Sequence, residues 1–264
     1  MTETACGITH GLPRVILTMK WGSLYPSTYV NVLFRAVGAN LDGPFRFVCL
    51  TDDPQGLEPG IEVYPIPEFG LPQIRWQIGG WPKLGVFQRD LYGLEGRALF
   101  IDLDMVILDD VAPFFDHPAP FVATDMGPNW KRRPGHGPTE PGTCLFAFTL
   151  GTEEQIFERF VADPRSAFDR FGLEQNCVAA FASSVTCWDP GWVISFKRHL
   201  RPQVLTGLVL PVRKPPVGAR VLAFHGRPRP LDLVRKGWWG QVPHVGRGPV
   251  GWMRDYWLAH GGTV

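Results

Sequence analysis

A run of ten residues, 99–108, places the strongest limit on how this chain can fold. Eight of the ten are apolar, and the other two are Asp102 and Asp104. Such a run is typical of a strand buried on both faces of a sheet. Residues two apart on a strand share a face and lie roughly 6–7 Å apart. We therefore predict two neighbouring carboxylates at the end of a buried strand, where a proton or a cation would relieve their repulsion. That both simply face solvent remains the alternative.

Composition narrows the classes of protein. The chain has 264 residues, of which 45% are hydrophobic, enough for one large domain. Lys and Arg number 26 against 25 Asp and Glu, so we expect no nucleic-acid partner. The five cysteines are an odd number without a Cys-x-x-Cys pair, which favours reduced thiols and a cytoplasmic location. No signal peptide and no transmembrane run is expected, while a peripheral membrane contact stays open.

The order of the expected elements favours an α/β fold. Residues 14–18, 45–50 and 61–66 read as strands, and a helix is expected over 25–40. This order predicts a mostly parallel central sheet flanked by helices. Further helices are expected over 81–92, 152–162 and 173–182, and further strands over 121–124, 143–149 and 220–224. Ligands of such sheets bind beyond the carboxyl ends of the strands, where Asp102 and Asp104 are expected.

Four motifs in this order resemble the GT-A fold glycosyltransferases, most closely glycosyltransferase family 8, which includes glycogenin and bacterial galactosyltransferases. The motifs are Trp81-Pro82-Lys83-Leu84, Asp102-Leu103-Asp104 with the following Val111-x-Pro113-Phe114-Phe115, Glu174-Gln175, and Phe224-His225-Gly226. The likeness spans about residues 14–230. It implies a single GT-A domain that moves a sugar from a nucleoside-diphosphate sugar, expected to be a UDP-sugar, to a saccharide, lipid-linked or other glycan acceptor.

The resemblance also implies roles for individual residues. Mn²⁺ or Mg²⁺ would be held by Asp102, Asp104 and His225, because hard cations prefer oxygen ligands and accept imidazole. The donor would be bound by Thr18, Lys20, Asp52, Lys83, Asp102 and Arg227, and Glu174 and Gln175 would lie at the transferred sugar.

The chain is expected to divide into an N-terminal extension (1–13), the GT-A domain (14–230) and a basic, aromatic tail (231–264). Few helix or strand signals occur over 228–239, so we expect this segment to close over the donor as a lid. The competing interpretation places Trp238 and Trp239 in the core or on a membrane surface.

Two other functions fit the central motif. In a haloacid-dehalogenase-like phosphatase, Asp102 would be the nucleophile and Asp104 the general acid. That motif normally opens its domain, whereas a strand–helix–strand unit precedes it here. A non-catalytic module that binds nucleotide sugars is the third hypothesis.

Overall fold

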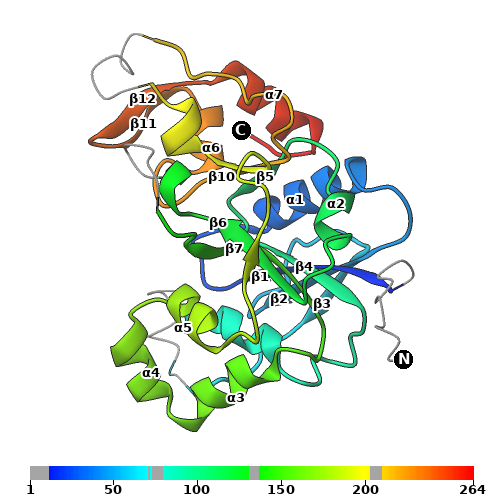
Figure 1. Cartoon of the computed structure of the whole chain (residues 1–264). Coiled ribbons are helices and arrows are strands. Elements are labelled where there is room, and N and C mark those ends of the chain that lie inside the picture. The colour runs from blue at the N-terminus through cyan, green and yellow to red at the C-terminus, as the bar shows by residue number, and fades with distance from the viewer. Residues whose placement is uncertain (1–11, 71, 73–79, 131–136, 203–209) are drawn as a thin grey trace, which may run out of the picture.

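The computed structural model describes residues 12–70, 72, 80–130, 137–202 and 210–264 (Figure 1). The strands are β1 (Arg14–Lys20), β2 (Arg46–Thr51), β3 (Ile61–Tyr64), β4 (Arg97–Ile101), β5 (Met105–Ile107), β6 (Phe121–Asp125), β7 (Pro141–Thr149), β8 (Thr186–Cys187), β9 (Val193–Ser195), β10 (Val221–Ala223), β11 (Gly237–Gln241) and β12 (His244–Gly248). The α-helices are α1 (Ser27–Ala39), α2 (Ala112–Phe115), α3 (Glu154–Ala162), α4 (Pro164–Phe171), α5 (Glu174–Phe181), α6 (Pro230–Val234) and α7 (Gly251–Ala259). Two 3₁₀ helices, η2 (Trp81–Phe87) and η3 (Pro128–Trp130), and a π-helix, η4 (Phe196–Leu200), complete the described elements.

The central sheet has the strand order β3-β2-β1-β4-β7-β6-β8. Its pairings are parallel except for the two that β7 makes with β4 and β6. The prediction of a mostly parallel sheet flanked by helices is therefore confirmed.

Two hydrophobic cores cover the two faces of this sheet. Alternate residues of each strand enter opposite cores, as the two-residue period of a strand requires. In β4, Leu99 and Ile101 pack with α1 and α2, whereas Ala98 and Phe100 pack with η2 and the α3–α5 group. Figure 1 shows α3, α4 and α5 gathered on one side of the sheet and α1 and α2 on the other. Because both faces are covered, the strands read as continuous apolar runs rather than alternating ones.

The run 99–108 departs from the prediction of one strand. It forms β4 and β5 with a turn at 102–104 between them, closed by a bond from Met105 N to Asp102 O of 3.2 Å. The two aspartates therefore lie on a turn rather than on one face of a strand. The turn forms because β5 leaves the central sheet and pairs instead with β10, which also pairs with β9.

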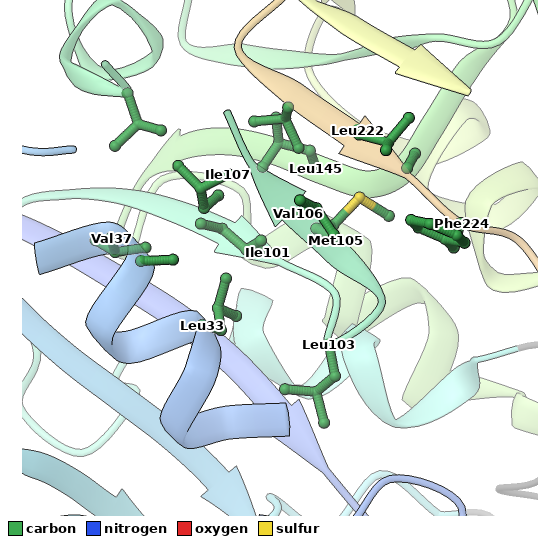
Figure 2. Close-up of a cluster of buried hydrophobic side chains, with 14 of the residues drawn as sticks. Leu33, Val37, Ile101, Leu103, Met105, Val106, Ile107, Leu145, Leu222 and Phe224 are labelled. Carbon is green, nitrogen blue, oxygen red and sulfur yellow. The ribbon is translucent and has the colours of Figure 1, made fainter. Parts of the chain in front are cut away.

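Apolar residues on both sides of the turn fix its position. Leu103, between the two aspartates, is buried. Figure 2 shows Leu103 near Leu33 of α1, and Met105 near Leu222 and Phe224 on the other side of the cluster. The turn is thus attached to α1 and to β10 by hydrophobic packing.

Two other predicted segments differ in the structure. The helix expected over 81–92 is the 3₁₀ helix η2, which ends at Phe87. All seven of its residues are buried, so it lacks the exposed polar stripe of a surface α-helix. Gly85 packs closely on Pro67: a Cβ added at position 85 would lie 3.2 Å from the Pro67 side chain. The segment 228–239, with few helix or strand signals, contains α6 and most of β11. The tail boundary at 230 and closure of a lid stay predictions.

Within the described residues, no helix combines the length and the apolar character needed to cross a membrane.

Arg97 provides a test of how the segment after α2 is held. Its buried guanidinium donates to the carbonyl oxygens of Pro120 (2.7 Å), Ala119 (2.8 Å) and His117 (3.4 Å). We expect Arg97→Met to lower the free energy of unfolding by about 3 kcal/mol, because buried carbonyls lose their donors. Urea denaturation measures this. The control, Arg89→Met, removes an exposed pair with Glu154 and should cost under about 1 kcal/mol. Equal losses in the two variants would contradict the assignment.

Candidate active site

Lys83 is the centre of a buried charged cluster. Its ammonium lies 2.8 Å from Asp102 Oδ2 and 3.3 Å from Glu174 Oε1, and it donates to Thr143 O at 3.3 Å. Three separate elements thus meet at one cation: η2 supplies Lys83, the end of β4 leads to Asp102, and α5 begins at Glu174. Thr143 on β7 also donates its hydroxyl to Glu174 Oε1.

The pKa values in this cluster reflect burial and opposite charge. Burial by itself lowers the pKa of Lys83, but the carboxylates of Asp102 and Glu174 outweigh it, so the pKa is raised. Burial raises the pKa of Asp102 to about 7 although Lys83 opposes the rise, and Asp104 adds to it. Lys83 is therefore a cation, and it stabilises the ionised form of Asp102.

Gly80 leaves room for the Glu174 carboxylate. Its φ of 69° lies in the left-handed region, and an added Cβ would lie 2.9 Å from the carboxyl carbon of Glu174. A larger residue at position 80 would displace the carboxylate from Lys83.

Asp104 has a different environment from Asp102. The Tyr25 hydroxyl donates to Asp104 Oδ2 at 2.8 Å, and the Arg229 guanidinium lies 5.2 Å from the centre of the Tyr25 ring. Burial raises the pKa of Asp104, against the lowering effect of the Tyr25 hydrogen bond. The two aspartates of the turn are thus held by different partners, a cation and a phenol.

His225 reaches the same region through β10. Phe224 N donates to Asp104 O at 3.1 Å, which extends the pairing of β10 with β5 and places His225 directly beyond the turn. His225 Nε2 and Ser195 Oγ are 2.8 Å apart, and the Trp130 ring stacks on the imidazole with the ring centres 5.8 Å apart.

One cavity of about 230 Å³ joins these groups. Six of the residues singled out from the sequence line it: Lys83, Asp102, Asp104, Glu174, Gln175 and His225. The other lining residues are Gly80, Met105, Met126, Trp130, Thr143, Cys144, Ala223 and Phe224.

Four predicted donor residues lie outside the lining of this cavity. The Thr18 side chain is buried and donates to Ile101 O at 2.7 Å, so it fixes the end of β4 just before the turn. Lys20 and Asp52 stand at the adjacent ends of β1 and β2, where Lys20 donates to Asp53 O and Asp52 accepts from Gly22 N. Arg227 is exposed. Their proposed contact with the donor stays a prediction.

Tyr25, Thr143, Ser195 and Trp130 were not predicted to hold the site residues. Tyr25 lies two residues before α1, and Trp130 is the last residue of η3. Ser195 carries no sequence signal, because only the pairing of β9 with β10 brings it to His225.

The donor set suits a hard cation in part. Asp102 and Asp104 offer carboxylate oxygens, and His225 offers an imidazole nitrogen. All three residues line the same cavity. In the described part of the chain, however, no three His, Cys, Asp or Glu side chains are gathered closely enough to hold a metal ion. Lys83, Tyr25 and Ser195 are hydrogen-bonded to the three side chains instead. A metal at this cavity would need oxygen ligands from a substrate as well.

Comparison with solved structures identifies the fold. The chain aligns with the galactosyltransferase LgtC in complex with donor and acceptor sugar analogs at a TM-score of 0.57, covering 95% of this chain and 97% of LgtC with 15% identity. The chain has the GT-A fold. An LgtC active-site mutant, in which glutamate replaces a glutamine, aligns at a TM-score of 0.53 and 14% identity over 82% of this chain and 89% of that one.

A match of lower sequence identity shows the same fold. The glycosyltransferase GlyE of Streptococcus pneumoniae TIGR4 aligns at a TM-score of 0.56 with 11% identity, covering 94% of this chain and 62% of GlyE. No family model and no curated protein sequence matches the chain. The resemblance to GT-A glycosyltransferases is thus confirmed at the level of structure.

Replacing Lys83 tests the charged cluster. We expect Lys83→Met, measured with a chelator present, to lower the free energy of unfolding at pH 8 by about 3–5 kcal/mol, because the buried Glu174 and the partly buried Asp102 carboxylates lose their cation. The loss should be smaller at pH 5. The pKa of Asp102 is higher in the folded protein than in the unfolded chain, so protonation of Asp102 stabilises the fold, and this stabilisation disappears as the pH rises from about 4 to about 7. At pH 5 folded Asp102 holds its proton and therefore loses less when the Lys83 cation is removed.

The control for Lys83→Met is Lys214→Met, which changes an exposed lysine. It should alter the free energy of unfolding by less than about 0.5 kcal/mol at both pH values. A Lys83→Met loss that does not depend on pH would contradict the role given to the carboxylates.

Proposed function

We propose that the protein is a glycosyltransferase that moves a hexosyl group from a nucleoside-diphosphate sugar, preferably a UDP-sugar, to a glycan acceptor. The observation that carries this proposal is the single cavity lined by Asp102, Asp104, Lys83, Glu174 and His225. Two carboxylates on a turn at the carboxyl end of β4, beside a cation and an imidazole, suit the diphosphate of a donor with its counter-ion.

The fold supports the same reaction class. LgtC, which aligns with nearly the whole chain, was solved with donor and acceptor sugar analogs. The LgtC mutant described above changes a glutamine in its active site, and in this chain Gln175 lines the cavity. We infer that the cavity takes the sugar end of a donor.

A divalent cation, Mn²⁺ or Mg²⁺, is part of the proposal. Asp102, Asp104 and His225 would hold it. When bound, such an ion neutralises the charge that develops on the departing nucleoside diphosphate. Tyr25 keeps the Asp104 carboxylate in place, and Ser195 does the same for the His225 imidazole.

The remaining side chains have roles in binding and orientation. Lys83, already placed between Asp102 and Glu174, would hold the donor sugar or a phosphate oxygen. Glu174 and Gln175 at the start of α5 would orient the transferred sugar and stabilise positive charge at its reacting carbon. Thr18, Lys20 and Asp52 mark the strand ends proposed for the base, and Arg227 would approach the diphosphate.

The phosphatase alternative is not favoured. The similar structures described above are glycosyltransferases. The Asp102–Asp104 turn follows β4, the fourth parallel strand along the chain, after β1, α1, β2 and β3. A non-catalytic binding module differs from the proposal only in turnover, so an activity assay decides between them.

The decisive experiment is a donor screen. The protein is incubated with a panel of nucleotide sugars and Mn²⁺, and release of nucleoside diphosphate is measured. We expect one UDP-sugar to be turned over, and Asp104→Asn to reduce turnover by about 10²-fold or more, since a charged ligand for the cation is lost. The control, Asp109→Asn, changes an exposed aspartate five residues later. Binding of nucleotide sugar without any turnover would support the non-catalytic module.

Glu174→Gln separates orientation of the sugar from binding of the nucleotide. The change keeps the shape and removes the charge, so we expect kcat to fall by about 10²-fold or more while the KM for the donor changes little. Steady-state kinetics with the donor found in the screen measures both. A rise in KM with an unchanged kcat would place Glu174 in ground-state binding only.

A further inference from the structure

Charge is distributed very unevenly along this nearly neutral chain. Residues 195–254 contain twelve of the 26 Lys and Arg but a single acid, Asp232, of the 25 Asp and Glu. The remaining residues carry fourteen bases against 24 acids. Such an asymmetry points to an anionic partner for the basic part. A donor diphosphate would use the bases near the cavity, but it leaves those of the β11–β12 hairpin unexplained.

The hairpin attaches to the protein by one face. Trp239 is buried and packs edge-on against Phe196, with the ring centres 5.8 Å apart. Gly246 lies opposite Trp239 in the pairing, and a Cβ there would lie 2.2 Å from the indole. Glycine at position 246 therefore allows the Trp239 ring to lie flat across the inner face of the hairpin.

The outer face of the hairpin carries a tryptophan and cations. Trp238 points away from the core because neighbouring residues of a strand face opposite sides, and it is 70% exposed. Its partner across the strands is Arg247, which is also exposed. Arg235 and Lys236 precede β11 and are exposed, and Val242 at the turn is 84% exposed. No acidic residue occurs between Arg235 and Gly248.

We propose that this outer face, defined by Arg235, Lys236, Trp238, Val242 and Arg247, docks on an anionic lipid membrane. Tryptophan prefers the interface between headgroups and acyl chains, and nearby Lys and Arg add electrostatic attraction to anionic lipids. The aliphatic Val242 favours lipid over nucleic acid, since a nucleic-acid surface uses aromatic rings and cations but has no site for an exposed valine at a turn.

The hairpin is joined to the candidate active site by a short aromatic stack. Trp239 packs on Phe196, and Phe196 stacks on Phe224 with the ring centres 4.8 Å apart. Phe224 lines the cavity next to His225. Docking through the hairpin therefore holds the cavity close to the membrane, where an acceptor attached to a lipid would be found.

Sedimentation with vesicles tests the proposal. The full chain is mixed with vesicles of phosphatidylcholine alone or of phosphatidylcholine with phosphatidylglycerol, without donor or metal. We expect binding to the anionic vesicles only, and a decrease when NaCl is raised from about 0.05 M to about 0.5 M. Arg247→Glu should weaken binding at least fivefold, and Trp238→Ser should weaken it further in the double variant.

Matched controls are available at the opposite end of the molecule (Figure 1). Arg165→Glu on α4 makes the same change of charge as Arg247→Glu. Val161→Ser on α3 replaces an apolar side chain that is 37% exposed by serine, as Trp238→Ser does on the hairpin. Both controls should bind like the unchanged protein. Thermal unfolding of all variants shows whether the hairpin substitutions leave the fold intact.

Two outcomes would overturn the proposal: no binding to anionic vesicles, or equal weakening by the controls and by the hairpin variants. Binding to a single-stranded oligonucleotide more tightly than to vesicles, with the same loss in Arg247→Glu, would also overturn it in favour of a nucleic-acid surface. Because the assay contains no donor, its failure would leave the proposed transferase activity untouched.

Discussion

The contact of the Lys83 ammonium with two carboxylates is the interaction on which the candidate site depends. Burial alone would neutralise Asp102, and a neighbouring Asp104 increases that tendency. Lys83 opposes it from 2.8 Å and at the same time holds Glu174 at 3.3 Å. The cation thus favours the ionised form of Asp102 in a cavity where burial favours the protonated form. Lys83 also joins η2, the turn after β4 and the start of α5. The same two ion pairs therefore set the charge of the site and hold these three elements together.

The second constraint is the pairing of β5 with β10, two segments more than a hundred residues apart in the chain. Since β5 leaves the central sheet, the chain must turn at 102–104, and the pairing continues as far as the bond from Phe224 N to Asp104 O. The same backbone ladder therefore creates the turn and delivers His225 to it. Asp102 follows the end of β4 by one residue, and His225 follows the end of β10 by two, so the strands hold both side chains in place.

Most of the sheet could be predicted from the sequence, because its strands are buried on both faces and appear as apolar runs between turn residues. The charged side chains and the imidazole of the cavity lining could also be predicted, because Lys83, Asp102, Glu174 and His225 belong to motifs with local signals. The turn inside 99–108 could not be foreseen, since both halves of the run are apolar and only the distant β10 separates them. For the same reason Ser195 and the Tyr25–Asp104 bond were missed: their partners lie 30 and 79 residues away in the chain.

The hydrophobic cluster under the turn explains how charged groups can be held in place beside a cavity. Leu103 is buried in the hydrophobic cluster of Figure 2, whereas Asp102 and Asp104 on either side of it line the cavity. Replacing Leu103 by a polar residue would remove the buried side chain that packs the turn onto this cluster. Rigid apolar support on one side and hydrogen-bonded carboxylates on the other is the arrangement that keeps ligand oxygens in position before a substrate arrives. The geometry of the site therefore derives from the core beneath it as much as from its charged residues.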